Sequence, residues 1–492
     1  MNSIDYTKVL HQLVYDPNNP LLFNSGFFVY FFIIFIIFYY LLRKKYMARA
    51  TLLSAFSLYF FYKASGSFVI LVVVSAVIDY ILSIWIYQQR NKVYKKTLLV
   101  VCIVLNLAVL FYFKYTNFFI DIINHFSFTK LDPIHILLPI GISFYTFENI
   151  SYAVDVYKNE IKPEKNIIHY LLFLSFFPKL VMGPIVRAKD FIPQLKKEYY
   201  VSTEDFSRGF FLIVSGLFKK LIISDYITLN LVDYVFDGPQ LHNGLECLVA
   251  IYGYAIVIYS DFSGYSDVAI GISKWLGITI PANFKSPYQS VALNEFWRRW
   301  HISLSSWLRD YLYIPLGGNK NGVIRTNINL FLTMLIGGFW HGASWNFIIW
   351  GALHGVGLII NKIWNILFKK YILLPKIITN TIYGLLTFHF VCFCWIFFKA
   401  QNLEIANTFI SQIAYNFTFE GYQIFINNYK FPLLMIVLGY TLHLMPESWS
   451  EKYIKLQTKL PLVYHITVVL CFIALYSYFK SSESVLPIYL QF

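Results

Sequence analysis

The sequence predicts an all-α integral membrane protein, and three features lead to this fold class. Of the 492 residues, 58% are hydrophobic and 13% are charged, whereas soluble proteins average roughly half and a quarter. Phe, Trp and Tyr supply 20% of the chain, more than a water-exposed body of this size would bury. The third feature is a series of long apolar runs. Together these features favour lipid as the solvent.

The apolar runs define the predicted membrane spans. Residues 21–42 contain no charged side chain, and a helix of this length crosses a bilayer core of about 30 Å. We expect an uncleaved anchor here, because residues 1–20 carry Asp5 and Asp16 and lack the basic start of a secretory signal. Further runs cover roughly residues 48–63, 67–87, 97–120, 134–153, 168–186, 208–230, 246–276, 326–362, 376–399, 430–445 and 461–480. About 10–12 crossings are therefore predicted.

Basic side chains in two loops predict the orientation of the chain. The first and third loops between spans each hold four of them: Arg43, Lys44, Lys45 and Arg49, then Arg90, Lys92, Lys95 and Lys96. Positively charged loops stay on the cytoplasmic side of a membrane. Both loops are therefore expected in the cytoplasm, and the N-terminus is expected to be extracytoplasmic.

The chain is expected to form a single membrane domain. It has no repeat of fixed period and no linker that would separate soluble domains. We expect an extracytoplasmic arm at residues 1–20, one transmembrane domain at 21–480 and a C-terminal tail at 481–492. The net charge of +14 fits basic loops beside an anionic membrane, since no basic tail for nucleic acid is present. The five cysteines, mostly in apolar runs, are expected to be free thiols.

The first segment with chemical potential is NEFWRRWHISLSSWLRDYLYIPLGGN, residues 294–319. It is too polar to span a membrane and too aromatic to lie in water, so we expect an interfacial or re-entrant helix. On a helix, His301 falls within an apolar stripe and faces the interior or lipid, while Arg298 and Arg309 point together from another side. The stripe consists of Trp297, Trp300, Leu304, Trp307, Leu308 and Tyr311. The arginines either bind lipid headgroups or form a phosphate-binding rim.

The second segment is GGFWHGASWNFIIWGALHG, residues 337–355. It places His341 between Trp340 and Gly342 in an apolar stretch. A lone histidine in such a stretch is usually a packing residue, but an ionisable group at membrane depth is costly and is a functional candidate for that reason. Glycines such as Gly338 leave room for another backbone or a narrow substrate. His341 is therefore a candidate general base.

Two further segments contain polar residues in apolar surroundings. In YSDFSGYSDVAIG, residues 259–271, Asp261 and Asp267 either relay protons, bind a cation or hold helices together through hydrogen bonds. In FFPKLVMGPIVR, residues 176–187, prolines near charged residues indicate a broken helix that lines a cavity.

The remaining motifs narrow the function. His354 and His389 also lie in apolar runs, and we expect them to be packing residues. The chain has no Walker loop, dinucleotide fingerprint, HExxH or GxSxG motif. ATP-driven transport and serine hydrolysis are thereby disfavoured.

The run FWRRWHISLSSWLRDYLYIPLGG, followed by IGGFWHGASWNFIIWGALHG, resembles the membrane-bound O-acyltransferase family. The separation of 40 residues between His301 and His341 also fits. Within the family the chain is similar to the bacterial branch that acylates cell-envelope polysaccharides, typified by the membrane subunit of alginate O-acetylation and by peptidoglycan O-acetyltransferases. LPIGISFYTFENISYAVDVY, FFPKLVMGPIVR and YSDFSGYSDVAIG support this branch, so the resemblance covers roughly residues 20–400.

The resemblance implies a fold and a site. The fold would be a ring of tilted transmembrane helices with re-entrant or interfacial helices, in which funnels from both faces meet near the histidines. His341 would be the essential catalytic histidine and His301 the second polar residue of the active site. Acetyl-CoA would be the acyl donor, and no metal is expected. The expected substrate-binding residues are Trp340, Trp345, Arg298, Arg309, Gly338 and Gly342.

The sequence thus predicts an O-acetyltransferase of the bacterial cytoplasmic (inner) membrane that moves acetyl groups outward for O-acetylation of a cell-envelope polysaccharide. The chain has 31 Lys against 9 Arg, which indicates an AT-rich genome. Alginate producers are expected to have GC-rich genomes, so peptidoglycan is favoured over an alginate-like exopolysaccharide. The expected partners are an extracytoplasmic serine esterase-like acetyltransferase and membrane lipids, but no nucleic acid. Two alternatives stay open: D-alanyl transfer from a carrier protein to teichoic acid, and a non-enzymatic proton-coupled transporter.

Overall fold

The computed structural model describes residues 12–17, 20–23, 25–126, 130–367, 374–480 and 485–488. Within these ranges the regular structure is helical and contains no strand, which confirms the predicted all-α class. Most of the expected N-terminal arm and of the expected C-terminal tail lies outside the described residues.

The chain divides into two compact units, each of which is described by itself. Unit 1 comprises Met1–Gly209 and Val268–Pro281, and unit 2 comprises Phe210–Asp267 and Ala282–Phe492. Helices α10 (Thr203–Phe218) and α13 (Gly244–Trp275) contain residues of both units.

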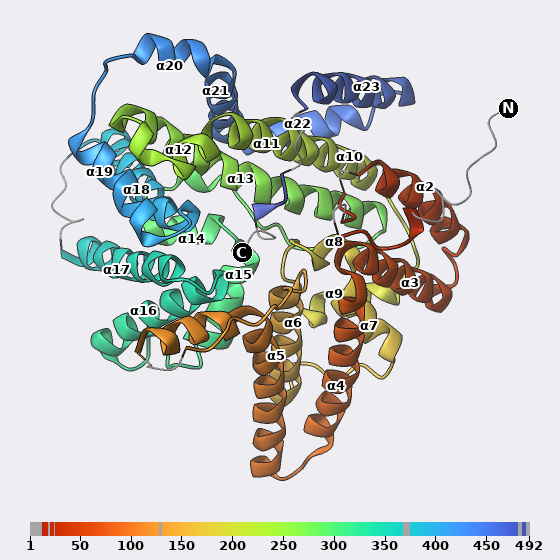
Figure 1. Ribbon diagram of the computed structural model, residues 1–492. Helices are drawn as coiled ribbons and strands as arrows, with labels where there is room; N and C mark the ends of the chain where they lie inside the picture. Colours follow the sequence, from red (N-terminus) through yellow and green to blue (C-terminus); the bar gives the residue numbers. More distant parts are fainter. Residues whose placement is uncertain are drawn as a thin grey trace. The chain divides into compact units, whose positions relative to one another are not determined.

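Unit 1 is built from helices whose beginnings follow local capping rules. Ser25 accepts a hydrogen bond from the Phe28 N–H at the start of α2, and Asn166 accepts one from the Ile168 N–H at the start of α7. Helices α4, α5 and α6 lie side by side (Figure 1). The helices are α2 (Gly26–Leu41), α3 (Tyr46–Ser65), α4 (Val69–Gln88), α5 (Lys92–Phe126), α6 (Ile142–Tyr157), α7 (Ile167–Ser175), α8 (Phe177–Leu180) and α9 (Ala188–Leu195).

A phenylalanine cluster forms part of the core of unit 1. The ring of Phe177 lies 4.9 Å from that of Phe56 and 5.4 Å from that of Phe60, measured between centroids. Phe28 and Phe32 complete the cluster from α2. Such edge-to-face and tilted contacts hold α2, α3 and α8 together without polar groups, as a lipid-embedded protein requires.

Unit 2 holds the remaining helices and the two predicted catalytic histidines. Its helical segments include the π-helical turns Lys219–Ser224, Thr228–Val232 and Arg309–Tyr313. The α-helices are α11 (Asp225–Ile227), α12 (Asp233–Asp237), α14 (Leu293–Arg299), α15 (Ile302–Leu308), α16 (Gly322–His341), α17 (Trp345–Leu367), α18 (Lys376–Lys399), α19 (Leu403–Tyr415), α20 (Tyr422–Asn428), α21 (Lys430–Leu444), α22 (Glu447–Gln457) and α23 (Leu462–Phe479).

The predicted membrane character is confirmed, with fewer full-length crossings than expected. Among the described residues, seven helical segments are long and apolar enough to span a bilayer, and two shorter apolar helices, α2 and α21, accompany them. Some expected spans are broken instead. Residues 168–186, for example, contain only the short helices α7 and α8 before an irregular stretch that includes Pro184, because proline cannot continue the helical hydrogen bonding.

Candidate active site

The segment predicted to form one amphipathic helix is broken directly before His301. Helix α14 ends at Arg299, Trp300 is extended, and α15 begins at Ile302. His301 itself lies in the left-handed region, with φ 42° and ψ 55°, a conformation that costs a non-glycine residue about 1–3 kcal/mol. The prediction of one helix over residues 294–319, and of the stripe drawn on it, is therefore wrong.

A short non-helical segment, Asn283–Lys285, holds this break in place. The N–H of Ile302 donates to the carbonyl oxygen of Asn283, and the N–H of Lys285 donates to that of Arg299, each over 2.9 Å. A continuous helix would satisfy the same backbone groups internally. These hydrogen bonds between two segments of the chain therefore replace one turn of helix and fix the backbone on both sides of His301.

The side chain of Asn283 is the feature of the site that the sequence did not reveal. It is 1% exposed. Its Oδ1 lies 3.1 Å from His301 Nδ1, 3.2 Å from the backbone nitrogen of Ser303 and 2.9 Å from the Ser303 hydroxyl. No local pattern identifies this residue, because its partners lie 18 and 20 positions further along the chain.

His301 is buried, as predicted. Its ring packs edge-to-face on Phe262 of α13, with 4.6 Å between the ring centroids. Burial lowers the pKa of His301 to about 3, because the imidazolium would lose its hydration there. The side chain is consequently a neutral imidazole at physiological pH.

His341 is the last residue of α16 and is 4% exposed. Its ring lies 5.0 Å from Trp350 and 5.3 Å from Phe398, both in edge-to-face geometry. The helix stops at Gly342, which is extended. The imidazole therefore lies at a helix end and is surrounded by aromatic rings from α17 and α18.

The ring of Trp340 contacts both histidines. Its centroid lies 6.4 Å from that of His301 and 4.9 Å from that of His341. The structure thus brings together two residues that are 40 positions apart in the sequence. We call His301, His341, Trp340 and Trp350 the histidine cluster.

Comparison with known proteins identifies the family. The family model described as "MBOAT, membrane-bound O-acyltransferase family" matches residues 159–407, a range that contains the whole histidine cluster. The chain belongs to the membrane-bound O-acyltransferase family.

Several curated relatives share long stretches with this O-acyltransferase. The peptidoglycan O-acetyltransferase of Helicobacter pylori is 38% identical over 363 residues, which cover 68% of each chain. A probable alginate O-acetylase of Pseudomonas syringae pv. tomato is 44% identical over 308 residues, 62% of this chain and 58% of that protein. The teichoic acid D-alanyltransferase of Bacillus subtilis is 32% identical over 283 residues, 55% of this chain and 70% of that protein. The chain thus spans somewhat more than half of the alginate relative's length.

The glycines near the histidine cluster make room for neighbouring protein atoms. A Cβ on Gly338 would lie 2.4 Å from the carbonyl oxygen of Phe347 and 2.7 Å from the Cα of Gly351. A Cβ on Gly342 would lie 2.1 Å from the Phe347 ring. Gly338 therefore permits close packing of α16 on α17, which is the typical use of small residues between membrane helices.

The predicted substrate-binding residues outside the cluster are more exposed. Arg298 is exposed, and Arg309 pairs with Asp310 over 2.8 Å with its side chain 64% exposed. Trp345, at the start of α17, is 54% exposed. The structure buries Trp340, Gly338 and Gly342 near the histidines but not these three side chains. Their roles stay predictions.

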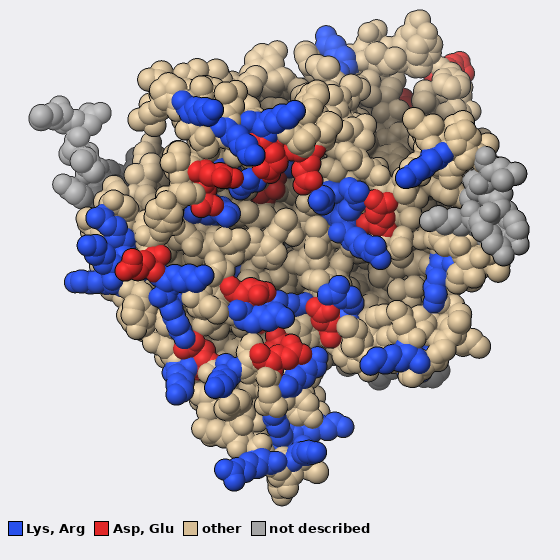
Figure 2. All heavy atoms as spheres, turned by 180° about the vertical axis from the view of Figure 1, so that it is seen from behind, with Lys and Arg blue, Asp and Glu red and all other residues tan. Residues whose placement is uncertain are grey.

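The charged side chains on one face of the molecule are mixed in sign. Figure 2 shows that most acidic side chains on this face lie directly beside Lys or Arg. Basic side chains without an acidic neighbour gather at the lower tip, where α4 and α5 join. The exposed basic residues of this junction are Arg90, Lys92 and Lys96. This junction is one of the two basic loops from which the orientation was predicted, and its sidedness stays a prediction.

The aspartates of residues 259–271 are paired with two consecutive lysines. Asp267 binds Lys219 over 2.6 Å, and Asp261 binds Lys220 over 2.5 Å. Lys220 also binds Asp225 over 2.7 Å. Of the roles considered for these aspartates, this arrangement favours a structural link between α13 and the π-helical turn Lys219–Ser224.

A second buried charge pair lies in unit 1, at the break that the prolines predicted. Lys179 of α8 binds Glu148 of α6, and both residues are 2% exposed. The other carboxylate oxygen of Glu148 accepts the N–H of Val186 over 3.0 Å. We call Glu148, Lys179 and Val186 the ion-pair cluster. Sequence reasoning missed Glu148, because it lay inside an expected span.

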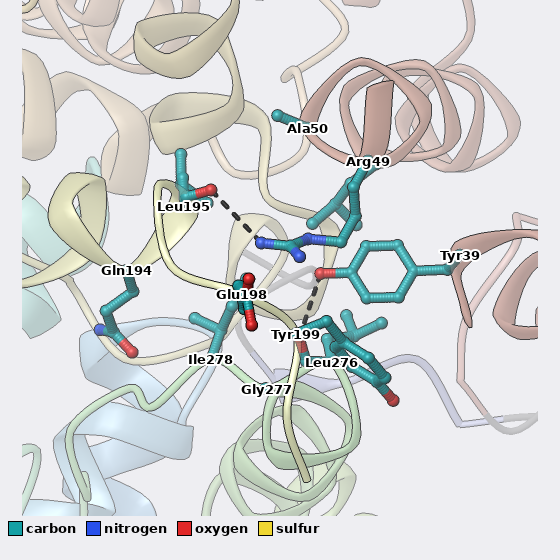
Figure 3. Close-up of a pocket in the computed structure, with 11 residues that line it drawn as sticks. Tyr39, Arg49, Ala50, Gln194, Leu195, Glu198, Tyr199, Leu276, Gly277 and Ile278 are labelled. Atoms are coloured by element: carbon teal, nitrogen blue, oxygen red, sulfur yellow. Dashed lines mark hydrogen bonds between the residues drawn. The ribbon is translucent and has the colours of Figure 1, made fainter. Parts of the chain in front are cut away.

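Arg49, expected in a basic loop, is instead buried in α3 beside a small cavity of unit 1. It is 5% exposed and donates to the carbonyl oxygens of Arg43 and Leu195 over 3.0 and 3.4 Å. Figure 3 shows its guanidinium facing Tyr39, whose hydroxyl donates to the Leu276 carbonyl oxygen over 3.0 Å. The cavity of about 10 Å³ has room for about one water molecule. It is therefore too small for a substrate.

Proposed function

We propose that this chain transfers an acetyl group from cytoplasmic acetyl-CoA to an acceptor reached from the extracytoplasmic side, for O-acetylation of a cell-envelope polysaccharide. The observation that carries the proposal is the histidine cluster: two buried imidazoles on one tryptophan, in a chain of the O-acyltransferase family. The names of the peptidoglycan and alginate relatives support the acetyl group and the polymer class.

The reaction uses the proton chemistry of imidazole. His341 removes the proton of the attacking hydroxyl while the hydroxyl oxygen bonds to the thioester carbonyl carbon. The carbon–sulfur bond then breaks, and coenzyme A leaves as a thiol with that proton. His301 orients a reacting group or stabilises charge. The burial of both residues supports these roles, because exclusion of water strengthens hydrogen bonds and charge interactions with a bound substrate.

The proposal includes a second protein. The histidines are buried, and a sugar polymer is too bulky to reach them, whereas a serine hydroxyl is not. An extracytoplasmic serine esterase-like transferase would therefore accept the acetyl group and pass it to the polymer. Arg298 and Arg309 would meet the phosphates of acetyl-CoA on the cytoplasmic side.

Sidedness is tested by labelling single cysteines in a variant without other thiols. A cysteine that replaces Lys95, in the junction of α4 and α5, should be protected from an impermeant maleimide on intact spheroplasts. Labelling of Lys95→Cys from outside would invert the proposed topology and place the donor on the wrong side.

The function is tested in cells that lack the native gene. Strains carrying wild type, His341→Ala or His389→Ala are compared for base-labile acyl groups on isolated peptidoglycan, exopolysaccharide and teichoic acid, identified by mass spectrometry. His389 is a suitable control, because it is exposed and bonds Tyr252. Acetate from a polysaccharide, lost only with His341→Ala, supports the proposal. D-alanine from teichoic acid would instead assign the activity named for the Bacillus subtilis relative, and an unchanged acyl content would refute the catalytic role.

A further inference from the structure

The hydrogen bonds around Asn283 determine which nitrogen of His301 carries the proton. Oδ1 of Asn283 accepts the backbone N–H of Ser303, and a backbone N–H has no alternative role as an acceptor. The amide atom at this position is therefore the oxygen and not the nitrogen. The same oxygen lies 3.1 Å from Nδ1 of His301. An oxygen without a hydrogen requires a donor opposite it, so Nδ1 carries the hydrogen.

The remaining nitrogen of His301 follows from this assignment. A neutral imidazole has one N–H and one lone pair, and His301 is neutral at physiological pH because burial lowers its pKa to about 3. With the hydrogen on Nδ1, Nε2 offers a lone pair and no hydrogen. Such a nitrogen accepts a hydrogen bond and has none to donate to the negatively charged oxygen of an acyl-transfer transition state.

The surroundings hold the Asn283 amide in this orientation. Ser303 donates to Oδ1 a second time through its hydroxyl, over 2.9 Å, and the amide nitrogen faces the Ser266 hydroxyl over 3.4 Å. The backbone of Asn283 accepts the N–H of Ile302, next to the strained His301. Strain of this kind persists where the surrounding structure over-determines it, and it gathers at functional sites.

We propose that Asn283 is a positioning residue that holds His301 as the Nδ1–H tautomer, so that Nε2 accepts a hydrogen bond from an O–H or N–H group of a bound substrate. This rests on the proposed function and sharpens it. Of the two roles open to His301, orientation of a reacting group is retained and charge stabilisation by donation is excluded.

The ring contacts of His301 make the effect of an added charge predictable. They include Phe262 on α13 and Trp340 on α16, which are not ionisable. The titratable side chain that follows Trp340 on α16 is His341. A carboxylate in place of the Asn283 amide would still accept from Nδ1, but it would stabilise the imidazolium. It would therefore convert Nε2 into a donor as the pH falls.

The test combines a tautomer measurement with kinetics on the purified full chain in liposomes. ¹⁵N spectra of histidine-labelled protein, with His301→Gln to assign the signal, should show His301 protonated at Nδ1. With the extracytoplasmic transferase added as acceptor, thioester turnover of acetyl-CoA should fall about 100-fold in kcat in Asn283→Ala, with little change in KM, as expected for a group that positions a hydrogen-bonding side chain. Asn329→Ala is the matched control, because Asn329 is buried in the same unit and donates to the Gly318 carbonyl oxygen.

The variant Asn283→Asp gives a second readout that loss of folding would not produce. Its activity should approach that of wild type at alkaline pH. On acidification, the activity of the variant should decline at a pH at least about one unit higher than the pH at which wild-type activity declines, because the carboxylate raises the pKa of His301. A His301 signal protonated at Nε2 in wild type would overturn the proposal, as would an unshifted pH profile in Asn283→Asp. The tautomer is measured without turnover, so the positioning claim and the proposed acyl transfer fail separately.

Discussion

The ion-pair cluster of unit 1 and the histidine cluster of unit 2 both bury polar side chains, but they differ in how those side chains are compensated. In the ion-pair cluster, Glu148 and Lys179 neutralise each other, and the second carboxylate oxygen is satisfied by the Val186 N–H. In the histidine cluster, the polar groups are imidazoles among aromatic rings, and His301 is neutral. The first arrangement contains compensated charges, and the second contains a neutral side chain that can still form hydrogen bonds with a bound substrate.

The difference separates a structural from a chemical use of buried polar groups. A buried ion pair is costly to break, because the remaining partner keeps a charge without compensation. A buried neutral histidine carries no such penalty and offers a bound substrate one hydrogen-bond donor and one acceptor. Substitutions in the ion-pair cluster should therefore change stability, whereas substitutions in the histidine cluster should change turnover.

The largest expected effect is on turnover in His341→Ala. We expect kcat to fall about 10²- to 10⁴-fold, the range for a positioned acid–base group, with the thermal midpoint of the detergent-solubilised protein little changed. Acetyl-CoA turnover with the extracytoplasmic transferase as acceptor, and a melting curve on the same preparation, measure the two quantities. An equal loss of stability would place His341 with the structural residues and remove the contrast.

The next effect is on folding in Lys179→Met, which leaves the Glu148 carboxylate buried without its partner. We expect a loss of about 3–5 kcal/mol in stability, measured by denaturant titration in micelles and by the amount of protein in the membrane. The double variant Glu148→Gln/Lys179→Met should recover much of this loss. A stable single variant with lowered kcat would show instead that the pair serves the chemistry.

A smaller loss of stability is expected from a substitution at the contact between α16 and α17, which positions His341. Gly338→Ala should cost about 1–3 kcal/mol, because the new methyl group overlaps backbone atoms of α17. Gly384→Ala on α18 is the control, since the nearest atom to its Cβ is 4.0 Å away. Equal stability of the two variants would indicate that α16 and α17 pack less closely than described.

The smallest effect is a change in KM for acetyl-CoA on substitution of Arg309, which is exposed and paired with its neighbour Asp310. An exposed charged contact is worth about 0.2–1 kcal/mol. Arg309→Ala should therefore raise KM for acetyl-CoA by no more than about fivefold and leave kcat unchanged. A large fall in kcat would place this arginine in the catalytic machinery, contrary to its exposure.

The sequence predicted the fold class and singled out His341 as a candidate, because both depend on local composition. Long apolar runs specify membrane helices, and a histidine flanked by glycine and tryptophan in such a run stands out. The break at His301 left no local signal, since a left-handed histidine depends on hydrogen bonds from a distant segment. Asn283 and Glu148 were missed for the same reason. Their importance comes from partners that only tertiary structure brings close.

The most direct test of the central claim uses purified protein in liposomes, with radiolabelled acetyl-CoA enclosed and the polymer and its extracytoplasmic transferase outside. Acetyl transfer through His341 to the transferase predicts labelled polymer with wild type, little label when the transferase is omitted, and none with His341→Ala. Labelled polymer from the His341→Ala protein, or efficient labelling without the transferase, would contradict it.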